Sequence, residues 1–402
     1  MQQQADRDVA ESRRPCYTFV EVRQTVYDRV YQKRKHMPVL MKDKYYNYDS
    51  LHDLASRIKA VFPSFQENDF VDHIMNETWD ALELKARMRQ ITINLGKYLP
   101  ADYKQALGII DQVIAGYPSG YNDNALIYFP DFVEVYGQDE CHWDLSMAAI
   151  ERYTPLSTAE FAVRPFIIKQ EARMMQQMAV WARHDNEHVR RLASEGCRPA
   201  LPWGQALTSF KKDPSPVLPI LEQLNTDPSL YVRKSVANHL NDISKTHPGL
   251  VTKIARDWYG RHEYTDWIVK HGCRTLLKKG NQEVLDIFGY HNAGSVDIAD
   301  FTLGSASISL GENMTFSFTV SAKETTKVRL EYAMGYVKAD GRLSRKIFQI
   351  SEILLKANQK KTYIKKHSFS DLRTRKHYPG THSVTLIVNG AEQDTLDFEL
   401  TI

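Results

Sequence analysis

Apolar residues between about residue 20 and residue 288 recur mainly at helical spacing, and strand-like alternation is scarce there. Steps of three or four residues, or short apolar runs, occur in segments 58–62, 91–95, 106–110 and 218–224. Proline, glycine, asparagine and aspartate separate these segments, as they do between helices. The pattern predicts an all-α domain over residues 1–290.

A short motif recurs within this helical region, at residues 188–195, 231–238 and 267–274. The steps between the copies are 43 and 36 residues, close to the period of HEAT or armadillo helical pairs. Asp185 and Asp227 precede the first two copies, where a helix start is expected. We therefore expect a solenoid in which each repeat buries its apolar stripe by stacking on its neighbour.

The hydrophobic period changes from 3.6 to 2 after residues 291–294. Apolar and polar residues alternate as in half-buried antiparallel strands, in segments 316–320, 328–332, 384–388 and 396–402. Asn389-Gly390 and Asp340-Gly341 are turn signals between such strands. The size and rhythm of residues 297–402 predict an immunoglobulin-like sandwich, so the fold class is α+β multidomain: an all-α HEAT-like-repeat solenoid followed by an all-β sandwich.

Composition narrows the class of protein further. A chain of 402 residues with 43% hydrophobic and 25% charged residues is typical of a soluble globular protein of two domains. No apolar run approaches ~18 residues, and the charged segment 1–14 has no hydrophobic segment behind it, so a cytoplasmic protein without a membrane partner is expected. The cysteines are too scattered for a zinc site or a disulfide framework, and no cofactor or metal is expected; they are Cys16, Cys141, Cys197 and Cys273.

The net charge of +3 does not by itself indicate nucleic acid, but basic residues are concentrated locally. Residues 342–376 contain eleven bases and only two acids, which suits phosphate contacts. Lysines that protect a strand edge from aggregation would give the same run. The DNA-binding candidates in this segment are Lys360, Lys361, Lys365, Lys366, Arg373 and Arg375.

Basic residues also recur at repeat positions in the helical region, where a solenoid could bring them to one surface. Such a surface would bind DNA phosphates or an acidic protein partner equally well. These residues are Arg164, Arg183, Arg190, Arg191, Arg198, Arg233 and Lys234.

Candidate chemistry gathers around residues 189–203. Arg191 and Glu195 lie four residues apart and share one helix face, although most such pairs are ordinary surface ion pairs. The prolines at 199 and 202 must end that helix, because proline has no N–H and disfavours helix at the residue before it. Trp203 is then presented by a stiff turn, or else packs beneath a loop.

Two further acids have comparable places. Glu160 is the fourth residue of an S-x-x-[DE] start at Ser157, where the macrodipole favours a carboxylate at a helix N-terminus. Asp242 lies near the end of a repeat helix, where its negative charge opposes the dipole. Pairing with Lys245 or Arg233 would explain Asp242, but so would a role in chemistry.

Four motifs in order resemble one family: residues 157–166 (STAEFAVRPF), 186–196 (NEHVRRLASEG), 198–203 (RPALPW) and 231–243 (YVRKSVANHLNDI). They are similar to the AlkC branch of the HEAT-like-repeat DNA alkylation-repair glycosylases, relatives of the AlkD branch, some of which carry an immunoglobulin-like domain. The resemblance covers nearly the whole chain and is weakest before residue 80.

This resemblance implies a monofunctional glycosylase of base excision repair that releases cationic bases such as N3-methyladenine and N3-methylcytosine without full rotation of the damaged nucleotide. It implies alkylated double-stranded DNA as the partner, and we expect a monomer. The catalytic cleft would contain Glu160, Arg191, Glu195, Trp203 and Asp242, all of which are present. Trp181 and Asp185 reproduce a spacing of the sister branch, but core and N-cap roles explain them equally well.

The expected chemistry follows from the charge of the lesion. A cationic base is already a good leaving group, so the main task is to stabilise the oxocarbenium character of the sugar with a carboxylate. Asp242 is expected to face the sugar, Glu160 and Glu195 to share electrostatic work and water positioning, and Arg191 to orient Glu195 or hold a phosphate. Trp203 would present its flat face to the deoxyribose and the cationic base. The alternative is a non-catalytic solenoid adaptor or DNA-binding scaffold.

Overall fold

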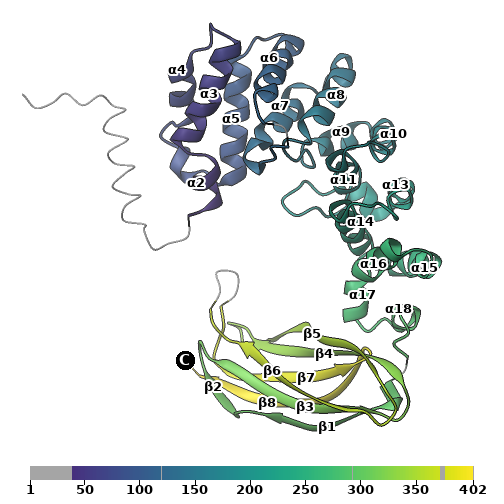
Figure 1. The fold of residues 1–402 in the computed structure, drawn as a ribbon. Helices are drawn as coiled ribbons and strands as arrows, with labels where there is room; N and C mark the ends of the chain where they lie inside the picture. The colour runs from purple at the N-terminus through teal and green to yellow at the C-terminus, as the bar shows by residue number, and fades with distance from the viewer. Residues whose placement is uncertain (1–38, 119, 292, 372–375, 402) are drawn as a thin grey trace, which may run out of the picture. The chain divides into compact units, whose positions relative to one another are not determined.

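The computed structural model describes residues 39–118, 120–291, 293–371 and 376–401 (Figure 1). The chain separates into two compact units between Asn94 and Leu95. Arg373 and Arg375, two of the predicted DNA-binding residues, lie outside the described residues, as does Cys16.

The first unit is helical. Helix α3 begins with a reciprocal capping box, in which Asn47 accepts from the Ser50 N–H and the Ser50 hydroxyl oxygen accepts from the Asn47 N–H, both at 3.0 Å. The buried side of α3, which includes Leu54 and Ile58, packs against α4. The buried residues of α4 include Phe70. The helices are α2 (Met41–Tyr45), α3 (Tyr48–Val61), α4 (Glu67–Ile74) and α5 (Leu84–Tyr98), which continues past the division.

The second unit begins with short helices and ends with strands (Figure 1). Its helices are α6 (Tyr103–Ala115), α7 (Tyr128–Tyr136), α8 (Trp143–Tyr153), α9 (Val163–Lys169), α10 (Glu171–Trp181), α11 (Glu187–Glu195), α12 (Thr208–Lys212), α13 (Leu218–Gln223), α14 (Leu230–Ile243), α15 (Pro248–Trp258), α16 (Glu263–Gly272), α17 (Arg274–Lys278) and α18 (Gln282–Ile287). Short 3-10 turns lie at Trp79–Ala81, Asn124–Ile127, Glu140–His142, Ser215–Val217 and Ala293–Ser295. The helical prediction is confirmed for the described residues up to 288.

The first two copies of the recurring motif lie on α11 and α14, and the third begins on α16 and ends at the start of α17; α14 packs against both α11 and α16. Val189, Val232 and Ile268 occupy the same motif position and are buried, so they form the shared core between repeats. The helix starts differ slightly from the prediction. Asn186, not Asp185, caps α11 by accepting from the His188 N–H, and Ser229 caps α14.

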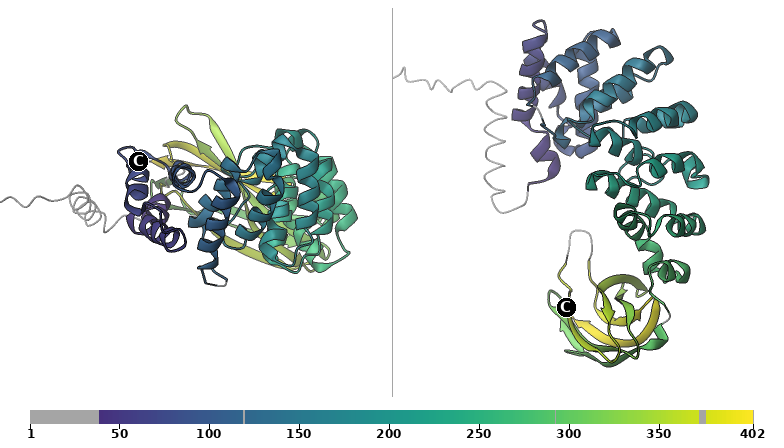
Figure 2. Two further views of the ribbon diagram at one scale, coloured as in Figure 1. Left: turned by 90° about the horizontal axis from the view of Figure 1, so that it is seen from above. Right: turned by 45° about the vertical axis from the view of Figure 1, so that its right-hand side comes forward.

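The strands form two sheets, which face each other in the turned view of Figure 2. One sheet has the order β1-β3-β6 and the other β2-β8-β7-β4-β5, and among the described strands only the β2–β8 pair is parallel. The strands are β1 (Val296–Leu303), β2 (Ser307–Ser309), β3 (Asn313–Ala322), β4 (Thr326–Val337), β5 (Leu343–Leu355), β6 (Lys360–Ser368), β7 (Gly380–Val388) and β8 (Ala391–Thr401). The immunoglobulin-like sandwich is therefore confirmed.

The predicted turns are also present. Asn389 and Gly390 join β7 to β8 with φ values of 47° and 79°, the left-handed geometry that a two-residue hairpin turn requires. Gly341, with φ 77°, lies between β4 and β5. Met314, Phe316, Phe318 and Val320 of β3 point into the sandwich core, as the period of two predicts.

Strand β4 departs from simple alternation, because its polar face is buried too. Arg329 and Glu331 on that face are 3% and 1% exposed and form an ion pair of 2.7 Å. Glu352 of β5 pairs with Arg329 and also with Lys270 of α16. An ion pair therefore connects the sandwich to helix α16. The buried acids and bases on this face of β4 neutralise one another, which permits their burial.

Cys141, Cys197 and Cys273 are free thiols. The described part of the chain contains no helix that meets the length and hydropathy needed to span a membrane. Nor does it bring together three or more His, Cys, Asp or Glu side chains in a metal-binding arrangement.

Candidate active site

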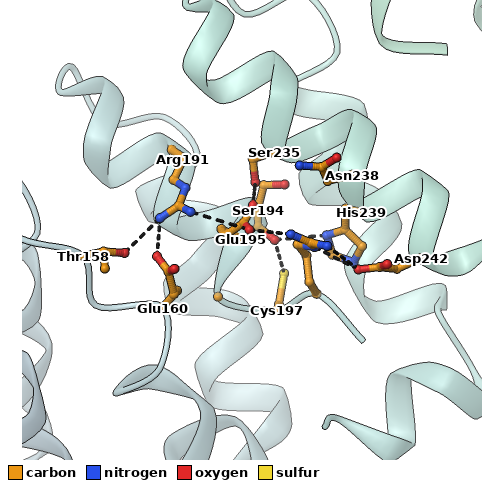
Figure 3. A network of polar contacts seen from close by, with 12 residues as sticks. Thr158, Glu160, Arg191, Ser194, Glu195, Cys197, Ser235, Asn238, His239 and Asp242 are labelled. Atoms are coloured by element: carbon orange, nitrogen blue, oxygen red, sulfur yellow. Dashed lines mark hydrogen bonds and ion pairs between the residues drawn. The ribbon is translucent and has the colours of Figure 1, made fainter. Parts of the chain in front are cut away.

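The three predicted acids come from separate segments that the repeat packing brings together (Figure 3). Glu195 ends α11, and Asp242 lies in the last turn of α14. Glu160 lies in the turn before α9, which begins only at Val163 and has no side-chain cap. The predicted helix start at Ser157 is therefore wrong, and the physical reason is that the Glu160 carboxylate is committed to Arg191 of α11.

Two arginines connect the acids into one ladder. Arg191 pairs with Glu160 and lies 3.5 Å from Glu195 through Nη2. Arg198 pairs with Glu195 through Nη1 and with Asp242 through Nε and Nη2, at 2.9 and 2.8 Å. Charges therefore alternate from Glu160 to Asp242, as the dashed lines in Figure 3 follow. This alternation permits three carboxylates to be 9% exposed or less without strong mutual repulsion.

Neutral and basic groups complete the shell of the ladder. The Thr158 hydroxyl accepts from Arg191 at 2.9 Å, and the Ser235 hydroxyl donates to Glu195 Oε2 at 2.6 Å. Lys245 donates to Asp242 Oδ1 at 2.9 Å, which confirms one of the two partners predicted for that acid. The other Glu160 oxygen, Oε1, accepts no hydrogen bond within the described chain.

Burial sets the protonation behaviour of the site. It raises the pKa of the Glu160 carboxyl, and Arg191 opposes that rise only in part. Burial also acts to lower the pKa of Arg191, but the nearby Glu160 and Glu195 outweigh it and the pKa is raised. Burial lowers the pKa of His239, beneath the ladder, to about 4, so this imidazole is neutral at neutral pH.

One face of α14 supplies much of the site. Tyr231, Ser235, Asn238 and Asp242 are spaced by four, three and four residues, which places them on one side of the helix. The Tyr231 ring lies against the Arg191 guanidinium, 5.2 Å from its centroid. The misplaced charge of Asp242 at a helix C-terminus is thus offset by Arg198 and Lys245.

Trp203 is 68% exposed, as the stiff-turn interpretation predicts, and its φ of 63° is unusual for a residue with a side chain. The loop that carries it is held by Arg164. The Arg164 guanidinium donates to the backbone carbonyls of Gln205, Gly196 and Arg198. Arg164 is 0% exposed, so its prediction as a DNA-binding residue is wrong: it is a structural residue that joins the end of α11 to the Trp203 loop.

Other predicted DNA-binding arginines are also occupied within the protein. Arg190 pairs with Asp227 at 2.7 Å and donates to the turn that precedes its own helix. Arg233 donates to the equivalent turn before α14 and lies 3.9 Å from the Tyr264 ring centroid. Arg198 belongs to the ladder and is 7% exposed. Arg198 is buried and its donors are used within the protein, which argues against direct phosphate contact. Arg190 and Arg233 are only partly buried, so DNA binding by these two residues stays a prediction.

The alternative pair, Trp181 and Asp185, is not assembled as a site. Trp181 is 0% exposed and donates from Nε1 to Glu151 at 2.8 Å. It is therefore a core residue, and Asp185 precedes the true cap of α11.

The predicted basic residues of the sandwich lie on edge strands. Lys360, Lys361, Lys365 and Lys366 belong to β6, at the edge of the three-stranded sheet, while β5 is the edge of the other sheet. Alternate β6 side chains point to opposite faces, so these lysines divide between the two sides of the strand. The location suits both edge protection and phosphate binding, so the two interpretations of the run stay open.

Sequence reasoning missed the role of Arg198, the central cation of the ladder. Its spacing of three residues from Glu195 was a usable signal for an ion pair. Ser235 and Thr158 had no such signal, because their contacts join residues 40 and 33 positions apart.

Comparisons with known proteins match both regions of the chain. The model of the family described as "DNA alkylation repair enzyme" matches residues 157–276, which contain every member of the ladder. The model described as "Uncharacterised protein YhaZ, C-terminal Ig-like domain" matches residues 297–402.

Two relatives match over most of their length. The uncharacterized protein YhaZ of Bacillus subtilis (strain 168) is 48% identical over 355 residues, which cover 88% of this chain and 98% of that protein. A solved structure of the alkylpurine DNA glycosylase AlkC of Pseudomonas fluorescens, bound to DNA containing an abasic site analog, is 37% identical with a TM-score of 0.86. The match covers 90% of this chain and 100% of that one.

Proposed function

Because the chain belongs to the family of DNA alkylation-repair enzymes that includes the alkylpurine DNA glycosylase AlkC, we propose that it excises cationic N-alkylated bases from duplex DNA. The proposed substrates are N3-methyladenine and N3-methylcytosine, and the reaction is hydrolysis of the N-glycosidic bond by a monofunctional enzyme. The observation that carries the proposal is the convergence of Glu160, Glu195 and Asp242 on one arginine ladder inside the matched region.

The ladder accounts for the first requirement of the reaction, which is a negative electrostatic environment for the sugar. As the glycosidic bond breaks, C1′ and the ring oxygen gain positive charge, and a fixed carboxylate stabilises it. Asp242 is the proposed group that faces the sugar. Arg198 orients Asp242 through two N–H donors, so no reorganisation of the carboxylate is needed as the charge develops.

A second carboxylate is needed to activate water. We assign this role to Glu160, because its Oε1 has no donor within the described chain and burial raises its carboxyl pKa above the ordinary value for glutamate, which strengthens it as a base. Glu195 accepts from both Arg198 and Ser235, so its proposed role is electrostatic support.

Trp203 would contact the deoxyribose and the cationic base. The exposed indole has a flat apolar face and a quadrupole that attracts cations. Because a cationic base leaves without strong protonation, the acids need to reach only the sugar, and full rotation of the nucleotide into a pocket is not required. The chain is proposed to act as a monomer, without a metal or other cofactor.

The proposed domains are residues 1–290, which carry the chemistry, and residues 297–402, which contribute DNA affinity. The lysines of β6, together with Lys234 on α14, are the proposed backbone contacts. Each phosphate contact releases counterions, so binding should weaken steeply with salt.

The decisive experiment incubates methylated duplex DNA with the full chain and separates released bases by chromatography. Release of N3-methyladenine or N3-methylcytosine by the wild type, and its loss in Asp242→Asn, is the expected result. Tight binding to the alkylated duplex without any released base would leave a DNA-binding scaffold and overturn the proposed chemistry.

A further inference from the structure

The repeat register places a basic residue where the first repeat carries an active-site acid. Glu195, Asn238 and Arg274 are each the eighth residue of their copy of the motif. The first two lie on α11 and α14, and Arg274 begins α17, just after the end of α16. Because these helices pack in succession, Arg274 continues the functional face one repeat beyond Asn238. Asn238 is four residues before Asp242 on the same face of α14.

Arg274 differs in its partners from three arginines of the first repeat, although Arg233 also lacks a carboxylate partner. Arg190, Arg191 and Arg198 all pair with carboxylates. Arg274 donates instead to two neutral acceptors, the His271 carbonyl at 2.8 Å and Asn238 Oδ1 at 2.9 Å.

The Arg274 guanidinium therefore retains capacity for an anion. Two of its five N–H donors are used, and the other three find no acceptor within the described residues. No carboxylate of the described chain lies within ion-pair distance of this side chain. Arg274 is only partly exposed, so it is held in place yet reaches solvent.

Two further basic side chains lie near Arg274, which also feels the charges of Asp242 and Arg198. Lys234 lies four residues before Asn238 on the same face of α14, is exposed, and has no ion pair among the described residues. His271 stacks on Trp267, with ring centroids 5.1 Å apart. The pKa of His271 is lowered by burial first and then by the nearby charges of Arg274 and Lys234.

We propose that Arg274, with Lys234 and His271 beside it, forms a phosphate-binding subsite that holds the DNA backbone next to the sugar faced by Asp242. The planar guanidinium can offer paired N–H donors to two phosphate oxygens, while Asn238 fixes its orientation. The inference rests on the proposed function, because it takes DNA as the ligand. It assigns a positioning role to the third repeat, which carries no acid of the ladder.

The test combines protein variants with DNA that lacks one backbone charge at a time. Short duplexes contain a non-cleavable abasic site analogue and a single neutral methylphosphonate at successive positions around it. Affinity and its salt dependence are measured for the wild type, Arg274→Gln and Arg274→Lys. The matched control is Arg256→Gln, since Arg256 lies on α15 and pairs with Glu283 on the surface at 3.1 Å.

The expected result is a loss of about 10-fold or more in wild-type affinity at one methylphosphonate position. Arg274→Gln should bind the unmodified duplex about as weakly, lose nothing more at that position, and have a salt slope smaller by about 0.9. Arg274→Lys should be intermediate, because it keeps the charge but loses the fork. Arg256→Gln should match the wild type.

If a folded Arg274→Gln protein bound the duplex with the affinity and salt dependence of the wild type, the proposed subsite would be wrong. A weakened variant that still responds to every methylphosphonate as the wild type does would also overturn it, because that result describes a structural residue. Release of bases is measured separately on methylated duplex. A wild type that shows the position-specific pattern but releases no base retains the subsite and loses the proposed reaction, whereas one that does not bind the duplex loses both.

Discussion

Replacement of Asp242 by asparagine tests the central electrostatic claim, because it removes one charge and almost no volume. Asp242 Oδ2 accepts from Arg198 Nε and Nη2, and Oδ1 accepts from Lys245 at 2.9 Å. An asparagine can accept on one side only, and its amide group would face a cationic donor on the other. The variant therefore separates charge from shape at this position.

The magnitude follows from what remains after the substitution. Loss of a fixed electrostatic group at a developing charge costs about 3 to 4 kcal/mol of barrier, or about 100- to 1000-fold in rate. The stability cost should stay below the ~3 to 5 kcal/mol of a fully broken buried pair. Arg198 retains Glu195, and the half-exposed Lys245 side chain can turn to water.

The assay is single-turnover excision of N3-methyladenine, with thermal unfolding measured on the same preparations. Asp227→Asn is the matched control, because Asp227 is 6% exposed, pairs with Arg190 at 2.7 Å and lies in the neighbouring turn outside the ladder. Both variants should lose a similar amount of stability, but only Asp242→Asn should lose excision. A folded Asp242→Asn protein with a rate within a few-fold of the wild type would refute the reasoning.

Four further outcomes are expected. Trp203→Ala should leave the unfolding temperature nearly unchanged, because the indole is 68% exposed. It should reduce the excision rate by about 10-fold or more. An unaffected excision rate would count against contact between Trp203 and the lesion. Arg164→Met should destabilise the fold by about 3 kcal/mol or more in denaturant titrations, because three backbone carbonyls lose their buried donor; full stability would contradict the structural role. Because burial raises the pKa of Glu160, excision should rise with pH as this carboxyl ionises, and Glu160→Gln should lack that limb of the pH–rate profile. Over the same interval its contribution to the free energy of unfolding should fall with pH, since the folded state binds the proton more tightly than the unfolded chain. Replacement of the basic residues of β6 by glutamine should lower DNA affinity and the salt dependence of binding, without changing the excision rate at saturating enzyme. An unchanged salt dependence would leave protection of the strand edge as their role. The residues are Lys360, Lys361, Lys365 and Lys366.

The ladder also explains how three carboxylates can be buried close together. Each carboxylate has at least one arginine donor, and Arg198 serves two of them. Removal of Arg198 would leave the buried Glu195 with Arg191 at 3.5 Å and the buried Asp242 with Lys245 as their remaining cationic partners, and the loss of a buried partner is costly. We therefore regard Arg198 as the residue that holds the proposed site together.

The local periodicities of the sequence determined the class of each region. The change of apolar spacing near residue 294 predicted the passage from helices to strands, and the motif steps predicted which helices are equivalent. Glu195 and Arg191, four residues apart on one helix, were also predictable as a pair. These features depend on backbone geometry over a few residues, and the local sequence determines that geometry.

Only the tertiary structure decided which arginines are available and which are committed. Arg164 donates to three backbone carbonyls and Arg190 pairs with Asp227, whereas Arg274 donates to two neutral acceptors and has no carboxylate partner within the described residues. The hydrogen-bond partners of Arg164 lie 32 to 41 residues away in the sequence, so no local sequence pattern predicts them. A guanidinium is satisfied by whatever carbonyl or carboxylate the packing places beside it, and that placement is a property of the whole fold.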